Sequence, residues 1–238
     1  MSSALPEAVH YHRWVLDLIW PHLGGRLLEV GFGYGQYTRQ LAGMVGELVS
    51  VDIDPACLDI GPTLPENVRL AMADVSDPDF PRQVGPAGFD AAVCLNVLEH
   101  IEDDRQALRS LRASLEPGGR LLLLVPAHPA LFGPMDRLAG HFRRYTRKML
   151  AERLAQAELR VMMLRYVNPI GAIGWWCNAR FHRPDSLSDP AINGQIRFFD
   201  KYVAPLSRLL TPCTSRLFGQ SLWAVAARDE GPCAESAA

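Results

Sequence analysis

Glycines at alternate positions in residues 27–38, LLEVGFGYGQYT, carry the clearest chemical signal in the chain. Gly31, Gly33 and Gly35 permit a tight turn and let a ligand approach the backbone where any Cβ atom would intrude. The dinucleotide-binding pattern GxGxxG would need a glycine at the position of Gln36. The turn therefore indicates a ligand site, and residues elsewhere must identify the ligand.

Polar side chains follow three further strand candidates. Asp52 lies in VDIDP, 17 residues after Gly35, where a carboxylate can accept hydrogen bonds from both hydroxyls of a ribose. Asp74 follows the next apolar run in AMADV, and Asn96 follows the one after that in FDAAVCLNVLEH. Because ligands of open α/β sheets bind outside the carboxyl ends of the strands, we expect these groups to converge on one crevice.

Short apolar runs alternate with helical patterns and position these residues. The strand candidates are residues 27–30, 48–53, 68–72, 89–95, 120–125, 159–166 and 221–227. Helical spacing is found in residues 7–20, 37–44, 55–60, 103–115 and 146–157. Strands that alternate with helices predict a parallel sheet with right-handed crossovers.

We interpret the chain as a single domain of residues 1–238. Its expected parts are a leading lid helix (1–24), a core (25–167 and 221–228), an inserted helical cap (168–220) and a disordered tail (229–238). The cap is inferred because a connection of this length between strands is usually functional or disordered.

The composition is that of an ordinary folded protein. The 238 residues are 48% hydrophobic and 21% charged, with a mean hydropathy of zero. The first residues lack a basic stretch followed by an apolar run, and no apolar run approaches the ~20 residues that span a bilayer. The five cysteines are scattered without a CxxC pair, which suits a reducing compartment. We therefore expect a cytoplasmic protein.

The ordered set LLEVGFGYG, VDIDP, MADV, FDAAVCLNVLEHI and LEPGGRLLLLVP resembles the class I S-adenosylmethionine-dependent methyltransferases. Within them it is most similar to the ubiquinone/menaquinone-type small-molecule group. The resemblance covers about residues 25–167 and the final strand. It implies an α/β, Rossmann-like fold: a seven-stranded, mostly parallel sheet with an antiparallel last strand and helices on both faces. It also implies S-adenosyl-L-methionine as cofactor and S-adenosyl-L-homocysteine as product.

The resemblance also implies the cofactor contacts. The residues expected around the methionine part are Glu29, Gly31, Phe32, Gly33 and Gly35. Asp52 would hold the ribose, and Ile53 would lie against the adenine. Asp74 would meet the adenine amino group with Val75 beside it, and Asn96 would line the floor near the sulfonium.

Two histidines are candidates for acid–base catalysis. His100 follows the fourth strand, and its side chain can deprotonate a hydroxyl because the histidine pKa is ordinarily near neutrality. The alternative is a structural histidine that caps the next helix. His141 is the first candidate for contact with the substrate. Some quinone-type O-methyltransferases carry Glu-x-x-Glu-His here and bind a divalent cation. Asn96 replaces the first carboxylate in this chain, so we expect no required metal.

Residues 126–150 follow the fifth strand, where this fold builds its acceptor pocket, and they open a basic stretch. Residues 134–183 carry 10 basic and 3 acidic side chains. Arginine matches carboxylate or phosphate groups bidentately, which favours an anionic acceptor, whereas a solvated helix start is the alternative. The residues expected to contact the acceptor are Tyr11, His128, Arg144, Tyr145 and Trp175.

Trp175 and the neighbouring Trp176 leave three interpretations open: an apolar acceptor pocket, contact with a membrane surface, or ordinary packing under the cap. A lipid-linked acceptor accounts for both the apolar and the basic features. We therefore expect methyl transfer to a small-molecule or lipid-like acceptor, with oxygen as the expected methylated atom.

Three other functions compete with this one. An NAD(P)-dependent oxidoreductase shares the sheet and the ribose carboxylate, but Gln36 departs from its glycine pattern. A non-catalytic S-adenosylmethionine-binding protein would keep the cofactor residues. A nucleic-acid methyltransferase is disfavoured because the net charge is −2 and no NPPY-type motif is present.

Overall fold

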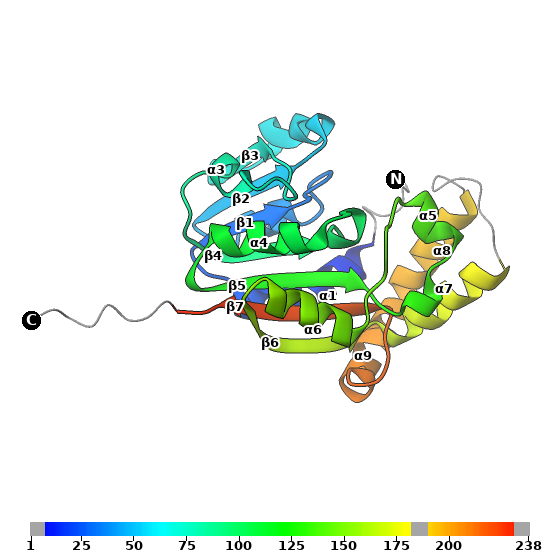
Figure 1. Ribbon diagram of the computed structural model, residues 1–238. Helices are drawn as coiled ribbons and strands as arrows, with labels where there is room; N and C mark the ends of the chain where they lie inside the picture. The colour runs from blue at the N-terminus through cyan, green and yellow to red at the C-terminus, as the bar shows by residue number, and fades with distance from the viewer. Residues whose placement is uncertain (1–7, 182–189, 231–238) are drawn as a thin grey trace, which may run out of the picture.

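The computed structural model describes residues 8–181 and 190–230, and its centre is one mixed sheet (Figure 1). The strand order is β3-β2-β1-β4-β5-β7-β6. The strands are β1 (Arg26–Val30), β2 (Glu47–Asp52), β3 (Val68–Met72), β4 (Phe89–Leu95), β5 (Leu115–Pro126), β6 (Leu159–Val167) and β7 (Ser221–Arg228). The predicted tail lies outside the described residues apart from its first two positions.

Strand direction matches the sequence prediction. The pairs β1–β2, β1–β4, β2–β3 and β4–β5 are parallel, whereas β7 is antiparallel to both β5 and β6. In β5, Leu121 and Leu122 point to opposite faces, and both are fully buried. A strand that is buried on both faces needs helices on both sides of the sheet.

Those helices are present on both faces. One core cluster joins the sheet to α3, α4 and α6, and the other joins it to α1 and α2. The α-helices are α1 (Val9–Ile19), α2 (Thr38–Ala42), α3 (Phe80–Gln83), α4 (Asp104–Ser114), α5 (Pro134–Leu138), α6 (Arg147–Gln156), α7 (Pro169–Phe181), α8 (Pro190–Phe198) and α9 (Ala204–Thr214). Single turns and short helices of other types are η2 (Trp20–His22), η3 (Pro55–Thr63), η4 (Leu98–His100), η5 (Pro129–Leu131) and η6 (Phe199–Val203).

Two elements differ from the sequence prediction. Residues 55–60 were expected as an α-helix, but η3 is a 3₁₀ helix that contains Gly61 and Pro62. Proline has no N–H to donate and glycine is a poor helix former, which disfavours a regular α-helix there. Strand β5 begins at Leu115, five residues before the predicted start, because Leu115 pairs with Phe89 ahead of an irregularity in the ladder.

The described residues between β6 and β7 (168–181 and 190–220) are mostly helical. Figure 1 shows α7, α8 and α9 gathered at one end of the sheet, beside α5. The two ends of this segment are joined: the Asn168 amide donates to the Gln220 side chain at 2.7 Å, and the Gln220 N–H donates to the Asn168 carbonyl at 2.9 Å. None of the described helices combines the length and apolar character that crossing a bilayer requires.

A residue of the inserted segment, Asp200, caps the N-terminal end of α1. The buried carboxylate of Asp200 accepts hydrogen bonds from the backbone N–H groups of His10 at 3.2 Å and Tyr11 at 2.8 Å. These are two of the four N–H groups that a helix start leaves without intrahelical partners. A negative charge is also favourable there because of the helix dipole. Asp200 therefore ties the lid helix to the inserted segment.

We expect Asp200→Ala to lower the free energy of unfolding by about 1–2 kcal/mol, because two buried N–H groups lose their acceptor. Urea denaturation monitored by circular dichroism measures this change. The control is Asp17→Ala on α1, which breaks the exposed Asp17–Arg208 pair at 2.7 Å and leaves Asp200 in place. That loss should be about 0.5 kcal/mol. Equal effects of the two substitutions would contradict the role of Asp200.

Candidate functional site

The glycine turn at the end of β1 is tightly folded. All three of its glycines, Gly31, Gly33 and Gly35, have positive φ angles, of 76°, 54° and 74°. A Cβ atom on Gly31 would lie 2.2 Å from Val97 Cγ2, and one on Gly35 would lie 2.6 Å from Ile60 Cδ1. Val97 and Ile60 fill the space that a side chain would need at Gly31 and Gly35, so both conformation and packing require glycine there. At Gly33 a Cβ atom would meet nothing closer than 3.8 Å.

Asp52 at the end of β2 is hydrogen-bonded to this turn. Its Oδ2 accepts from the Gly33 N–H at 2.9 Å, and its Oδ1 accepts from the Asp54 N–H at 3.0 Å. Each carboxylate oxygen can accept a further hydrogen bond, so a ligand diol can still be held. The next side chain, Ile53, is 65% exposed although it is apolar. An exposed apolar side chain beside a half-buried carboxylate suits a ligand with one flat apolar part and one hydroxylated part.

The ends of β3 and β4 supply the next two predicted residues. Asp74 Oδ1 accepts from the Ser76 N–H at 2.8 Å and from the Ser76 hydroxyl at 2.7 Å, while Val75 is buried in the core. Asn96 is exposed, has a φ of 53°, and donates its N–H to the Leu124 carbonyl at 2.8 Å. Such a φ is uncommon outside glycine, and residues of this kind concentrate at functional sites.

Two predicted cofactor residues lie beneath the turn rather than on its surface. Glu29 is 3% exposed, and its carboxylate accepts from the Ser50 hydroxyl at 2.7 Å. Burial raises the pKa of Glu29 to about 7, and the Ser50 hydrogen bond partly opposes that rise. Phe32 is 2% exposed. Both residues support the turn from the core side.

A hollow of about 640 Å³ lies between α1 and the glycine turn. Its lining includes His12 and Arg13 of α1, Tyr34 and Gln36 of the turn, and Arg39 of α2. Polar and apolar side chains therefore surround one side of the turn, and the volume is in the range of small-molecule sites.

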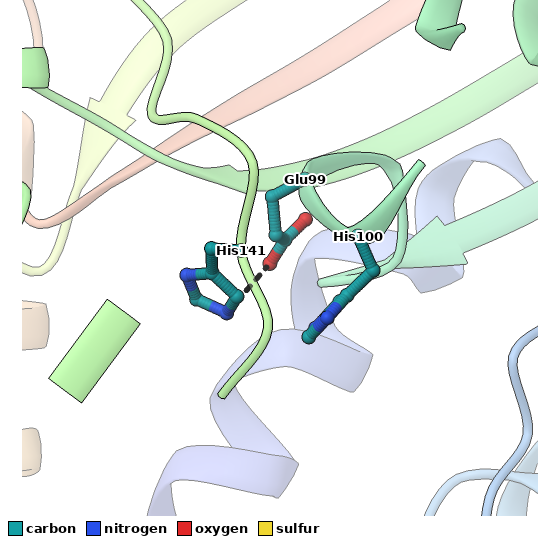
Figure 2. Close-up of side chains that lie close together, drawn as sticks. All are labelled: Glu99, His100 and His141. Carbon is teal, nitrogen blue, oxygen red and sulfur yellow. Dashed lines mark ion pairs between the residues drawn. The ribbon is translucent and has the colours of Figure 1, made fainter. Parts of the chain in front are cut away.

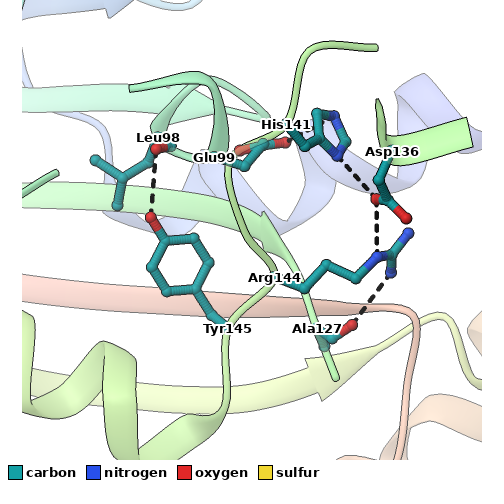
Figure 3. Close-up of polar contacts among 7 residues, drawn as sticks. All are labelled: Leu98, Glu99, Ala127, Asp136, His141, Arg144 and Tyr145. Carbon is teal, nitrogen blue, oxygen red and sulfur yellow. Dashed lines mark hydrogen bonds and ion pairs between the residues drawn. The ribbon is translucent and has the colours of Figure 1, made fainter. Parts of the chain in front are cut away.

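A buried carboxylate organises the loop after β5 (Figure 3). Asp136 Oδ1 accepts from Arg144 Nε at 2.8 Å and lies 2.9 Å from His141 Nδ1, while Oδ2 accepts from the Gly133 N–H at 2.9 Å. Burial by itself raises the pKa of Asp136. The hydrogen bond from His141 and the positive charge of Arg144 outweigh that effect, and the pKa lies below its usual value.

His141 is oriented by this carboxylate. Because Asp136 accepts at Nδ1, that nitrogen carries the hydrogen, and Nε2 is left to face Glu99 Oε1 at 4.0 Å. The ring of His100 lies 4.6 Å from that of His141 in an edge-to-face arrangement. Figure 2 shows Glu99, His100 and His141 gathered around one point. The two predicted catalytic histidines are thus brought together.

Burial and the neighbouring charges shift the pKa values in this cluster. Glu99 is 1% exposed, and burial raises its pKa to about 8, although the charge of Arg144 opposes the rise. The pKa of His100 lies below its usual value because neighbouring protein atoms partly desolvate its otherwise exposed side chain and because His141 is close. A neutral imidazole at His100 is therefore favoured near pH 7.

Arg144 and Tyr145 were expected to contact the acceptor, but both are buried and are hydrogen-bonded to other groups of the protein. Arg144 is 2% exposed, and besides Asp136 it donates to the Ala127 carbonyl at 3.1 Å and lies 4.6 Å from the Trp175 ring. Tyr145 is fully buried and donates its hydroxyl to Asp104 at 3.0 Å. Arg144 thus pairs with a buried internal carboxylate, and its guanidinium gives no support for an anionic acceptor.

The remaining three acceptor candidates occupy different places. Tyr11 lies near the cluster: burial raises its pKa to about 12, a hydrogen bond to Ser221 opposes the rise, and the charge of Glu99 adds to it. Trp175 is half-buried against Arg144. His128 has a φ of 59° and stacks on Tyr166 with ring centroids 4.8 Å apart.

Glu99 and Asp136 were not among the residues predicted to act in catalysis or to contact the cofactor or the acceptor. The available signal for Glu99 was its position beside His100, directly after a strand. The signal for Asp136 was an acidic residue isolated within a basic stretch. Neither signal identified the partner that each carboxylate would find.

The comparisons with known proteins agree with this geometry. Residues 9–164, well over half of the chain, match the family model described as a methyltransferase domain. A ubiquinone/menaquinone biosynthesis C-methyltransferase of Ectopseudomonas mendocina is 29% identical over 164 residues, which are 63% of this chain and 62% of that protein. An uncharacterized methyltransferase of Mycobacterium tuberculosis is 35% identical over 125 residues, which are 52% of this chain and 61% of that protein. The chain thus spans about three fifths of the length of each relative.

Solved structures share the fold at lower identity. An S-adenosylmethionine-dependent methyltransferase from Mesorhizobium loti superposes with a TM-score of 0.61 and 16% identity, over 93% of this chain and all of the other. At that identity the match establishes the fold alone, which here includes the strand order and the antiparallel β7. Because the family model matches residues 9–164, the chain belongs to the methyltransferase-domain family, and its sheet has the class I methyltransferase fold.

Proposed function

We propose that the protein transfers a methyl group from S-adenosylmethionine to an oxygen of a small-molecule or lipid-like acceptor. The observation that carries this proposal is the cluster of Glu99, His100 and His141, which directly follows the end of β4. Asn96, the residue expected near the sulfonium, lies three positions before Glu99. A hydroxyl placed there has groups that favour its deprotonation on one side and the methyl donor on the other.

The described residues fit the cofactor. The glycine turn lines the hollow beside α1, Asp52 keeps acceptor capacity for the ribose hydroxyls, and the exposed Ile53 offers an apolar surface for the adenine. When bound, S-adenosylmethionine supplies a methyl carbon that forms the new bond to oxygen while the S–CH₃ bond breaks and its electron pair stays on sulfur. The protein's main task is then to align the two reactants, which can contribute ~7–11 kcal/mol.

In this proposal the histidine cluster removes the acceptor proton. His141 is held by Asp136 with Nε2 free of that contact, and His100 is exposed beside it. A neutral imidazole within reach of a hydroxyl can accept its proton, which contributes typically 10²–10⁴-fold in rate. Tyr11 and Trp175 are the acceptor-contacting residues that we retain from the sequence prediction, because Tyr11 lies near Glu99 and Trp175 packs on Arg144.

The inserted segment supports an apolar acceptor. Large apolar side chains are exposed on α7, α8, η6 and α9: Ile173, Trp176, Phe198, Tyr202, Leu206, Leu209 and Leu210. Such a surface suits a lipid-like molecule or peripheral contact with a membrane. Carbon is the second candidate for the methylated atom, because the relative from Ectopseudomonas mendocina carries the name of a C-methyltransferase.

A label-transfer assay tests this proposal. The purified chain should move labelled methyl from S-adenosylmethionine to a small molecule in cell extracts, and the product should carry an O-methyl group in mass and NMR spectra. Label on a ring carbon would favour the second candidate. Binding of S-adenosylhomocysteine without transfer to any extract component would favour a non-catalytic binding protein.

We expect Asp52→Ala to weaken binding of S-adenosylhomocysteine by about 1–3 kcal/mol, because charge-assisted hydrogen bonds to the ribose are lost. Isothermal titration calorimetry measures the change. Asp59→Ala serves as control, since Asp59 is an exposed carboxylate in η3, the helix that follows β2. Unchanged affinity in Asp52→Ala would remove this residue from the cofactor site.

We expect His141→Ala to lower kcat by about 10²–10⁴-fold while the affinity for S-adenosylhomocysteine stays the same, because the imidazole acts on the acceptor alone. His22→Ala is the control. His22 ends η2 and lies near Arg120 of β5, whereas Glu99, His100 and His141 follow β4 and α5. Wild-type turnover in His141→Ala would assign the residue to packing.

A further inference from the structure

We propose that Glu99, His100 and His141 form a binding site for one divalent transition-metal ion. Two imidazoles and one carboxylate are a ligand set that suits Zn²⁺, Mn²⁺ or Fe²⁺. The metal-binding atoms of the three side chains all lie within 4.8 Å of one another (Figure 2). From the sequence we expected no required metal, because Asn96 replaces the first carboxylate of the Glu-x-x-Glu-His pattern. The fold supplies a different third ligand, His141, which is 41 positions from His100 in the sequence.

The strongest support is an oxygen atom without a partner. Glu99 is 1% exposed, and its Oε2 has no hydrogen-bond partner anywhere in residues 8–181 and 190–230. A buried carboxylate oxygen that bonds to nothing is costly, and unsatisfied groups of this kind are rare in folded proteins. The other oxygen, Oε1, faces His141 Nε2 at 4.0 Å. A cation between the two side chains would satisfy both.

His141 has the surroundings of a metal-binding imidazole. Such histidines commonly donate their second ring N–H to a carboxylate, which fixes the ring and raises the basicity of the coordinating nitrogen. Here Asp136 accepts from Nδ1 at 2.9 Å, so Nε2 is the nitrogen that is presented. Asp136 is itself held by Arg144 and by the Gly133 N–H.

The backbone fixes the two parts of the cluster relative to each other. Glu99 and His100 end the short helix η4, while His141 lies in the loop after α5. The N–H of Phe142 donates to the Glu99 carbonyl at 2.8 Å, which ties the loop to η4. The three ligands are thus assembled before any ion arrives, and ion binding requires little rearrangement.

The site is open on one side, since His100 is exposed. Three protein ligands leave coordination positions free for water or for an acceptor oxygen. A bound divalent cation lowers the pKa of a coordinated hydroxyl, so its O–H bond breaks, the electron pair stays on oxygen and the proton passes to water. This consequence rests on the proposed function, and in it the cation replaces the imidazole as the means of deprotonation. Ion binding itself does not rest on it.

Ion binding by the purified full-length chain tests the inference. After treatment with a chelator and dialysis, we expect one Mn²⁺ per chain by electron paramagnetic resonance and one Zn²⁺ by calorimetry. Glu99→Gln and His141→Ala should each weaken binding at least 10-fold, and Asp136→Asn should do so by 10–100-fold through the orientation of His141. His22→Ala should bind both ions as the wild type does.

Folding of each variant is checked by circular dichroism. If Glu99→Gln fails to fold, His100→Ala replaces it, because the exposed His100 side chain contributes little to the core. Failure of the wild type to bind either ion, or equal affinity in the wild type and the cluster variants, would overturn the inference. Methyl transfer that persists with a chelator in a chain that binds no ion leaves the proposed function standing without the metal. Ion binding without transfer to any acceptor supports the metal site and rejects the proposed function.

Discussion

Parallel pairing of the first four strands is the constraint on which the site depends. Val30 of β1 pairs with Val51 of β2 and with Cys94 of β4, so the residues that follow each strand emerge at the same level. A slip of one residue in the β1–β2 ladder would turn every side chain of the slipped strand to the opposite face and would move Asp52 relative to the glycine turn. Because helices pack on both faces of the sheet, such a slip would also disrupt the packing between the strand side chains and those of the helices.

A second constraint acts on the acceptor side, where the buried charge of Asp136 holds the loop after β5. Its partners Arg144 and His141 come from the same loop, so one carboxylate sets the positions of a cation and of a ring. Removing one member of such a network is expensive because the others stay buried and unpaired. Glu99 lies next to this network but is not hydrogen-bonded to it. The Asp136 carboxylate is thus fully occupied by protein groups, whereas Oε2 of Glu99 has no partner among the described residues.

The sequence predicted the sheet and the glycine turn better than it predicted the loop after β5. The strands, the glycine turn and Asp52 follow from local patterns: apolar runs, a glycine spacing and a carboxylate directly after a strand. Arg144 was expected to face the acceptor, yet it pairs with Asp136 eight positions away. Local pattern cannot choose between solvent, a ligand and a distant carboxylate as the partner of an arginine. Only the packing of the loop makes that choice, and it also hides Tyr145 against Asp104.

The joined ends of the segment between β6 and β7 have a consequence for changes within that segment. Asn168 and Gln220 hold the two ends of the segment together through two hydrogen bonds, so the segment leaves and re-enters the sheet at one place, as a closed loop does. The entropy of closing a loop grows only slowly with its length, and its contents can change while the anchor remains. Changes of length or sequence inside this segment should therefore leave the ends of β6 and β7, and with them the sheet, in place.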